Sequence, residues 1–421
     1  MTNGDLVIKD GVLVKYKGSS RTVVIPEGVT KIGELVFQLR DIVSITIPES
    51  VVEIGEGAFN ACEHITSITI PDSVTKIGSG AFRGCRALAD ENGFVIIKGV
   101  LHSYHGIDEN VVIPYGVTCI GDNAFYECKK ITSVTIPNTI TRIGNYAFGE
   151  CKKLKNICIP ESVVNIGVGA FQNCKSLAKK GLVIVRDVLY NYFGKSKNVI
   201  IPEGIKEIGP SAFITNFDIE KVFLPDTVNR IGDMAFWHCD NLRDINISEN
   251  IDLGDAVFAG CTKLAKDNCV VFNDVFCYYC GNEETLKIPN HIKRIDAVSL
   301  RCKKFKNVIL PNGITVIHED AFRNCEKLER IVIPESVVEI KSGAFNRCKN
   351  LYDVEIPNSV TSIGSIAFCG CSNLKQIVIP KSVTEIGVNA FLDCDNVIIY
   401  AFSGSYAEQY AKVNNIPFVA E

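Results

Sequence analysis

A pattern of about 23 residues repeats along almost the whole of this 421-residue chain. One clean copy runs from Val134 to Leu154 and follows the consensus V-x-I-P-x-x-V-x-x-I-G-x-x-A-F-x-x-C-x-x-L. A fixed period of this length is the signature of a solenoid, in which each coil packs mainly on its two neighbours. A chain made of such structural repeats has little sequence left for a dedicated active site.

Fourteen copies can be counted from the residue that ends the expected strand. Most steps between copies are 22 or 23 residues long, and three steps are 41 to 43 residues long. The fourteen positions are Pro26, Pro48, Pro71, Pro114, Pro137, Pro160, Pro202, Pro225, Ser248, Pro289, Pro311, Pro334, Pro357 and Pro380. Each long step holds a second kind of unit, which also opens the chain.

This second unit has the pattern of a hairpin. Its copies lie near residues 6–18, 94–106, 182–194 and 269–281, and each ends in Tyr-x-Gly. From this order we expect a single solenoid over residues 1–398, containing fourteen repeats and four hairpin-like units. Residues 399–421 would form a C-terminal cap, because the last coil would otherwise leave an open sheet edge.

The residue types explain why each repeat would form a coil. The stretch 133–136 alternates and is rich in β-branched residues, which is typical of a strand with one buried face. Pro137 suits the end of that strand because proline has no N–H to donate. Gly144 permits a turn with positive φ, and Ala147 and Phe148 are best interpreted as a short helical turn. The sequence therefore predicts a repeat solenoid with a parallel β-sheet on one side and short helical turns and irregular coil on the other.

Composition gives few hints about partners. The net charge of -4 and the pI near 6.0 give no global reason to expect nucleic acid as a partner. No run of 18 apolar residues is present, so we expect no membrane span. The first twenty residues show no signal-peptide pattern and already belong to the repeat array, which favours a cytoplasmic protein.

Eleven of the 18 cysteines occupy one repeat position, three residues after the phenylalanine. They are Cys62, Cys85, Cys128, Cys151, Cys174, Cys239, Cys261, Cys325, Cys348, Cys371 and Cys394. A cysteine that recurs with the core pattern is most simply a small buried hydrophobe in a stacked column. Disulfides between coils are the alternative, because stacked neighbours would lie about 5 Å apart. Unpaired thiols in this number favour a reducing compartment.

The repeat elements V-x-I-P, V-x-x-I-G, A-F and C-x-x-L together resemble the BspA-type leucine-rich repeat family. The ending Gly404–Glu408, followed by Tyr410-Ala411 and Ile416–Phe418, is similar to the usual ending of that family, and its S-x-x-E pattern matches a helix capping box. The resemblance covers nearly the whole chain. It implies a right-handed leucine-rich-repeat superhelix and a non-enzymatic surface or secreted protein that adheres to host proteins or other cells.

Two further functions stay open beside that one. The chain could be an intracellular scaffold for protein–protein interactions, or a metal-binding or redox-active protein that uses Cys277 and Cys280. The latter pair forms a C-x-x-C, and His102 and His105 resemble a ligand pair. Both pairs lie on expected strands, where residues i and i+3 face opposite sides, so we expect their side chains to diverge. We expect no cofactor.

The best functional signal is the row of residues two positions before each strand-ending proline, which should point away from the core. Threonines predominate early in this row, whereas Ile200 and Phe223 make its middle apolar. An exposed run of large apolar residues tends to mark a contact surface, although β-propensity on an exposed strand explains it too. We expect a protein-binding patch formed by Ile200, Lys221, Phe223, Asp244 and Asn246.

The glycine of the repeat is replaced in three successive coils, by Asp296, His318 and Lys341. These side chains could form a polar stripe on the outer corner of the solenoid. Sequence drift at a tolerant turn position is the simpler interpretation.

Overall fold

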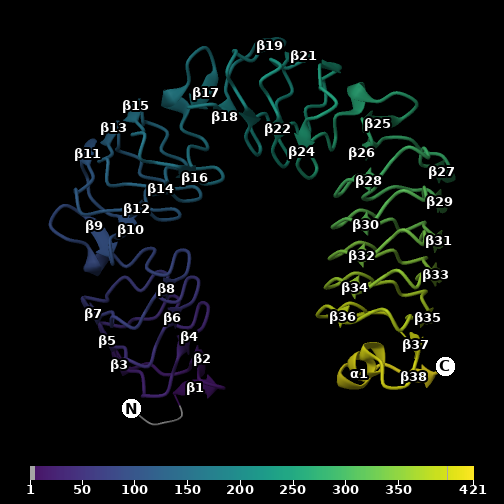
Figure 1. Cartoon of the computed structure of the whole chain (residues 1–421), viewed down its shortest axis with the longest axis horizontal. Coiled ribbons are helices and arrows are strands. Elements are labelled where there is room, and N and C mark those ends of the chain that lie inside the picture. Colours follow the sequence, from purple (N-terminus) through teal and green to yellow (C-terminus); the bar gives the residue numbers. More distant parts are fainter. Residues whose placement is uncertain (1–4, 396) are drawn as a thin grey trace. The chain divides into compact units, whose positions relative to one another are not determined.

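The computed structural model describes residues 5–395 and 397–421. The chain forms two compact units, Met1–Gly194 and Lys195–Glu421, and each is considered by itself. Both units are solenoids built mostly from short parallel strands, which confirms the predicted repeat fold. Successive coils add strands to two separate rows, so that a coil has two hydrogen-bonded sides; the rows are clearest in the second half of unit 2 (Figure 1).

The first row contains the strands that precede the prolines. These strands pair in parallel with the expected register, for example Val134 with Ile157. In unit 1 they are β3 (Thr22–Val24), β5 (Ser44–Thr46), β7 (Ser67–Thr69), β11 (Asn110–Val112), β13 (Ser133–Thr135) and β15 (Asn156–Cys158). In unit 2 they are β19 (Asn198–Ile200), β21 (Lys221–Phe223), β23 (Asp244–Ile245), β27 (Thr285–Lys287), β29 (Asn307–Ile309), β31 (Arg330–Val332), β33 (Asp353–Glu355) and β35 (Gln376–Val378).

The second row contains two-residue strands that end just before the repeat glycine, and the sequence patterns did not predict it. In unit 1 these strands are β4 (Lys31–Ile32), β6 (Glu53–Ile54), β8 (Lys76–Ile77), β12 (Cys119–Ile120), β14 (Arg142–Ile143) and β16 (Asn165–Ile166). In unit 2 they are β20 (Glu207–Ile208), β22 (Arg230–Ile231), β24 (Asp252–Leu253), β28 (Arg294–Ile295), β30 (Val316–Ile317), β32 (Glu339–Ile340), β34 (Ser362–Ile363) and β36 (Glu385–Ile386).

The hairpin-like units are antiparallel hairpins that join the second row. They comprise β1 (Leu6–Lys9) with β2 (Val12–Tyr16), β9 (Phe94–Ile97) with β10 (Val100–Tyr104), β17 (Leu182–Val185) with β18 (Val188–Tyr192), and β25 (Cys269–Phe272) with β26 (Val275–Tyr279). Strands β2, β10 and β26 then pair in parallel with β4, β12 and β28. No hairpin adds a strand to the first row among the described residues, so that row ends at β7, β15 and β23.

The third side of each coil contains no helix at the Ala-Phe pair, in contrast to the expected helical turn. Tyr146 and Glu150 both adopt positive φ, of 51° and 61°. This conformation lets alternate N–H groups point toward the next coil: those of Tyr146, Phe148 and Glu150 donate to main-chain carbonyls of that coil over 2.8–2.9 Å. Strain at the two left-handed residues is thus offset by complete main-chain pairing on this side. Short 3-10 helices occur only further along, at η1 (Arg86–Leu88), η2 (Lys175–Leu177) and η3 (Thr262–Leu264), among the described residues.

Glycine is needed in the repeat for close approach rather than for positive φ. Gly144 is not in the left-handed region, but a Cβ atom there would lie 2.7 Å from the main-chain carbon of Gly121 in the preceding coil. A side chain at Gly144 would therefore require these two coils to shift locally, whereas Asp296, His318 and Lys341 are accommodated at the same position of three other coils.

A ladder of phenylalanines fills the centre of each unit. Phe148 stacks on Phe125 and on Phe171, with ring centroids 4.9 and 5.4 Å away and interplanar angles below 10°. All three rings are fully buried. Where Leu300 replaces the repeat phenylalanine, Phe305 places its ring 6.4 Å from Phe322 and so fills the gap.

The C-terminal residues cover the last coil of unit 2. Strand β37 (Ile398–Ala401) extends the first row, and β38 (Phe418–Ala420) pairs with it in parallel. Helix α1 (Tyr406–Val413) lies between them in sequence. The first bond of the expected capping box forms, because the Ser405 hydroxyl accepts from the Glu408 N–H. The Glu408 carboxylate accepts from the N–H of Gly404, one residue before the N-cap, instead of from that of Ser405.

Replacing Phe148 by alanine should lower the free energy of unfolding by about 3–5 kcal/mol, because it removes a buried ring and leaves a cavity between two others. Urea denaturation followed by circular dichroism measures this loss. Thr135→Ala, on the exposed face of β13, is the control and should change stability by roughly 0.5 kcal/mol or less. An equal effect of both substitutions would contradict the stacked core.

Candidate functional site

The predicted outward row is exposed in all fourteen coils. Its members are Val24, Thr46, Thr69, Val112, Thr135, Cys158, Ile200, Phe223, Asn246, Lys287, Ile309, Val332, Glu355 and Val378. Ile200 and Phe223 are direct register partners on β19 and β21, with exposed fractions of 72% and 44%. Several other residues of this outward row are also apolar. The pair differs from them because Phe223 is the one aromatic residue in the row.

Charged residues flank the apolar pair, and they are paired with one another. The Lys221 ammonium lies 3.2 Å from the Asp244 carboxylate, its register partner on β23. The carboxylate of Glu220, the residue before Lys221, pairs with Lys197 over 2.7 Å and with Arg243. Since Glu220 is half-buried and the other members of these pairs are more exposed, water screens the pairs and each stabilises the fold little.

Asn246 has a structural role that the sequence did not indicate. Its amide donates to the Leu224 C=O over 2.8 Å and its side-chain oxygen accepts from the Leu224 N–H over 2.7 Å. These two bonds satisfy the main chain at the end of β21, because β23 is only two residues long. The structure therefore brings Ile200, Lys221, Phe223 and Asp244 together on one exposed sheet, with Asn246 at its margin holding the main chain.

Cys277 and Cys280 have different surroundings. Cys277 is fully buried on β26, whereas Cys280 follows the strand and lies near the surface, where its thiol reaches the Asn268 C=O. Burial raises the pKa of the Cys277 thiol well above its usual range. A buried neutral thiol is a poor nucleophile and metal ligand, and the expected divergence of the two side chains is confirmed.

His102 and His105 also diverge. His102 is buried, with its ring edge-on to Phe82 at 5.3 Å, and burial lowers the pKa of its imidazole to about 4. His105 instead lines a hollow of about 360 Å³, where its Nε2 lies 3.0 Å from the Ser103 hydroxyl. No group of three or more His, Cys, Asp or Glu side chains arranged to hold a metal ion occurs in the described part of the chain.

The cysteine column forms a second ladder beside the phenylalanines. Each column thiol points at a main-chain carbonyl of the preceding coil; the Cys151 Sγ, for example, lies 3.0 Å from the Phe125 C=O. Burial raises the pKa of the Cys62 thiol to about 11 and that of Cys174 to about 12. Cys62 and Cys174 are therefore structural groups with little thiolate at neutral pH.

The three residues that replace the repeat glycine do not form an exposed stripe. Asp296 is completely buried, and His318 and Lys341 are half-buried. The Asp296 carboxylate accepts from the Ala297 N–H over 2.9 Å and faces Arg294 at 3.4 Å, while its second oxygen has no partner among the described residues. Arg294 in turn donates to the carbonyls of Leu253 and Gly254. The sequence did not predict this buried pair of Arg294 and Asp296, because nothing in the repeat pattern indicates which coils bury a charged side chain.

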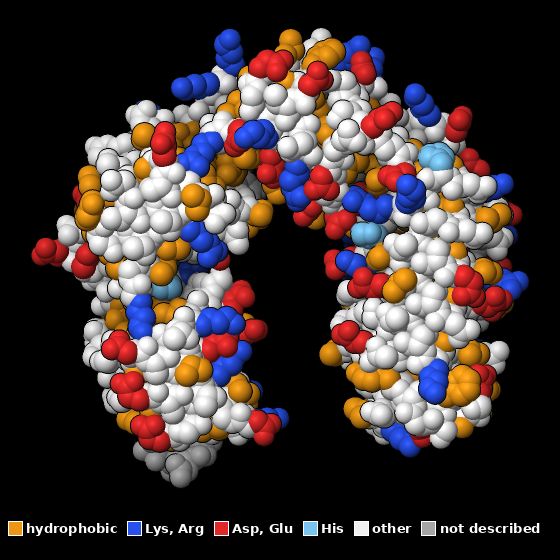
Figure 2. All heavy atoms as spheres, in the orientation of Figure 1, with side chains coloured by type: hydrophobic (Ala, Val, Ile, Leu, Met, Phe, Trp, Pro, Cys, Tyr) orange, Lys and Arg blue, Asp and Glu red, His pale blue; other side chains and the backbone are white. Residues whose placement is uncertain are grey.

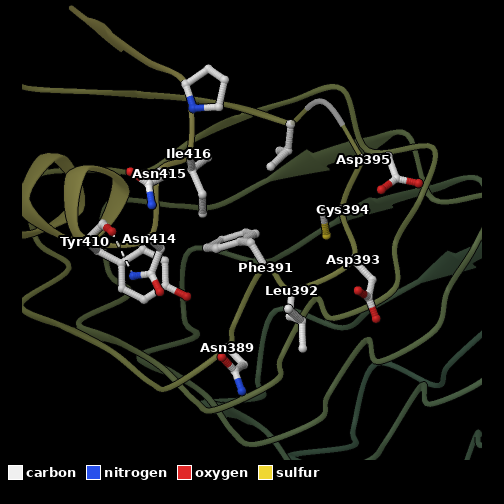
Figure 3. Close-up of a pocket in the computed structure, with 12 residues that line it drawn as sticks. Asn389, Phe391, Leu392, Asp393, Cys394, Asp395, Tyr410, Asn414, Asn415 and Ile416 are labelled. Atoms are coloured by element: carbon white, nitrogen blue, oxygen red, sulfur yellow. Dashed lines mark hydrogen bonds between the residues drawn. The ribbon is translucent and has the colours of Figure 1, made fainter.

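A hollow of about 370 Å³ lies where helix α1 meets the last coil (Figure 3). The Phe391 ring and Tyr410 form part of its wall, and Asp393 and Asp395 lie at its rim. Asn414 also lines the hollow, and its side-chain amide donates to the Tyr410 C=O over 2.8 Å. A hollow with polar groups around it is expected where a cap covers the last coil incompletely. The described residues of this hollow include no convergent set of catalytic side chains.

Acidic and basic side chains are interspersed over the visible face of each unit (Figure 2). No helix in the described chain is both long and apolar enough to cross a bilayer.

Thiol reactivity should follow this burial. Under native conditions Cys158 and Cys302, the two exposed cysteines of the described chain, should be alkylated first by iodoacetamide at pH 8. Column thiols such as Cys151 should react only after unfolding. Mass spectrometry of timed samples measures the order, and early modification of Cys151 would contradict the ladder.

Asp296 should make stability depend on pH. Burial raises the pKa of its carboxyl from 3.8 to about 7, despite the opposing effect of Arg294. The folded state therefore binds this proton more tightly than the unfolded state. The stability that this tighter proton binding gives the folded state is fully present below about pH 4. It is lost as pH rises toward 7, by at most about 1.4 kcal/mol per pH unit.

Asp296→Asn should remove this slope and be more stable than the parent chain above pH 7. Urea midpoints at pH 5, 6, 7 and 8 measure the difference, with exposed Asp226→Asn as control. A difference between Asp296→Asn and the parent that stays constant over these pH values would rule out the buried titration.

Comparison with known proteins identifies the repeat. The family model described as the BspA type leucine rich repeat region matches residues 13–92, 103–182, 179–271 and 270–398. No curated protein matches the chain.

Among solved structures, the chain is similar to a leucine rich cell surface protein from Faecalibacterium prausnitzii, with 28% identity, coverage of 84% of this chain and 94% of that one, and a TM-score of 0.35. It is also similar to a leucine-rich repeat protein from Bacteroides ovatus, with 20% identity, coverage of 96% and 97%, and a TM-score of 0.25. The pneumococcal vaccine antigen PcpA matches with 15% identity, coverage of 100% and 98%, and a TM-score of 0.27.

Proposed function

The chain belongs to the BspA-type leucine-rich repeat family, and from this premise we propose that it is a non-enzymatic protein-binding scaffold. We place its function in adhesion at the cell surface or after secretion, where the partner is a host matrix or cell-surface protein. The binding surface of this proposal is the outward face of β19, β21 and β23, formed by Ile200, Lys221, Phe223 and Asp244.

The observation that carries the proposal is the exposed pair Ile200 and Phe223. Two large apolar side chains lie side by side on strands whose main chain is fixed by the ladder, so the main chain beneath them loses little conformational freedom on binding. An aromatic residue surrounded by charges that can re-pair is typical of an interface hot spot and its polar rim. A long, regular sheet face also provides extended contact with modest chemistry, which suits binding better than catalysis.

An intracellular interaction scaffold is the second function that the same surface supports. The observation that favours it is the number of free thiols, because such thiols persist in reducing compartments. The two functions differ in the class of partner and use the same residues.

Phe223→Asp should weaken partner binding at least tenfold and leave folding stability unchanged, because the side chain is exposed and its loss removes a contact rather than a core group. Binding of purified protein to a panel of extracellular-matrix proteins and to a cell lysate measures this, with thermal denaturation of each variant. Val378→Asp is the matched control, since Val378 occupies the same row with 47% exposure on β35.

Loss of matrix binding in Phe223→Asp alone supports the adhesion function. Loss of binding only to lysate proteins supports the intracellular function. Equal binding by the parent chain and both variants refutes the choice of surface.

A further inference from the structure

The hairpin inserted after β15 leaves an open strand edge inside unit 1. The three-stranded sheet β11, β13 and β15 ends at β15, because the next segment forms the β17–β18 hairpin on the other side of the coil. The described residues of unit 1 therefore place no first-row strand beside β15. An exposed edge of this kind is a ready template for another extended chain.

The main chain at this edge lacks the partners that its neighbours have. In the preceding coil the Thr132 C=O accepts from the N–H groups of Lys155 and Asn156, over 2.8 and 3.2 Å. The equivalent carbonyl one coil later belongs to Lys155, and it accepts no hydrogen bond from any described residue. Since a strand directs alternate residues to alternate neighbours, the N–H and C=O of Ile157 also point to the open side.

The core is partly uncovered at the same place. Val134 on β13 and Ile136 just after that strand are buried, whereas Ile157 and Ile159, one coil later, are half-buried. Together with half-buried Leu177 and Ile184 of the following segments, they line a hollow of about 610 Å³. An open edge thus borders an apolar floor, which is the combination that strand addition uses for affinity and specificity.

The rim of this hollow is basic. Lys155, Lys179 and Arg186 line it, and none of its lining residues is acidic. The guanidinium of Arg186 is fixed by bonds of 2.7 and 2.8 Å to the carbonyls of Val163 and Pro160, and no ion pair is recorded for Lys155 or Lys179 within the described residues.

The hollow beside β23 in unit 2 provides a comparison. Its volume is about 500 Å³, and its lining mixes Asp244 and Asp267 with Arg243, Lys266 and Lys287. Ile245, the inward residue of β23, is buried. The combination of an uncovered floor and a single charge sign therefore distinguishes the hollow beside β15 from the hollow beside β23.

We propose that this hollow is a binding site for an extended acidic peptide segment, which adds a strand to β15, places alternate apolar side chains on Ile157 and Ile184, and directs its carboxylates to Lys155 and Lys179. This site lies in unit 1 and is distinct from the surface around Phe223, so it goes beyond the function proposed above. Main-chain pairing supplies affinity that does not depend on the peptide side chains, whereas the floor and the lysines select alternating apolar and acidic residues.

The test uses the full chain and an acetylated, fluorescent seven-residue peptide in which glutamate and valine alternate. Fluorescence anisotropy should show saturable binding that weakens as salt is added. One comparison peptide carries N-methyl groups on alternate residues, which removes the main-chain donors. A second carries lysine in place of glutamate.

Charge reversal tests the rim. The double variant Lys155→Glu and Lys179→Glu should weaken binding at least tenfold. The double variant Lys129→Glu and Lys130→Glu, which makes the same charge change at exposed positions outside the hollow, should bind as the parent chain does. Phe223→Asp should also leave this binding intact, so the outcome is separable from that of the proposed function.

The position of the peptide is read with a photoreactive residue at its centre, followed by mass spectrometry. Cross-links within residues 155–186 support the proposal. Cross-links elsewhere, equal binding by the N-methylated peptide, or no saturation up to about 1 mM would each overturn it.

Discussion

The distance between successive coils is the constraint on which the whole structure depends. Parallel strands lie about 4.8 Å apart, and the centroids of stacked phenylalanine rings in this chain are 4.8–5.5 Å apart. The same spacing must hold on all three sides of a coil, since a solenoid whose sides rose by different amounts would shear its core. The main-chain bonds at Phe148 and the missing Cβ of Gly144 hold the third side to that spacing.

Sequence reasoning recovered whatever recurs with the period. The strand before each proline, the buried phenylalanine and cysteine columns and the exposed row containing Phe223 follow from residues that return every 22 or 23 positions in most coils, and the hairpin positions follow from a longer period of 87 or 88 residues. The second row was missed because each of its strands has only two residues, which is too short to show an alternating pattern. The left-handed residues were missed because tyrosine and glutamate, the residue types at 146 and 150, do not indicate positive φ. Hydrogen bonds to the next coil hold Tyr146 and Glu150 in that conformation.

The remaining misses involve contacts between particular coils. Asn246 substitutes for a main-chain partner, and Asp296 fills the place of a glycine with a buried carboxylate. Neither role is visible in a consensus, because each depends on what lies beside that residue in the neighbouring coil. The binding surfaces fall into the same class. A periodic sequence specifies the scaffold, and departures from the period create its individual sites, as where the hairpin after β15 uncovers Ile157.

The interruptions of the first row also have a mechanical consequence. Within an uninterrupted stretch such as β27 to β35, separating two coils along the solenoid axis requires breaking main-chain bonds on several sides at once. Inside unit 1 both rows stop before the second hairpin, the first at β7 and the second at β8, so fewer main-chain bonds hold the coils together there. Under tension the coils should therefore separate first at each hairpin, while the coils between hairpins stay together. A chain loaded in this way would separate at its hairpins, which recur every 87 or 88 residues, instead of unravelling coil by coil.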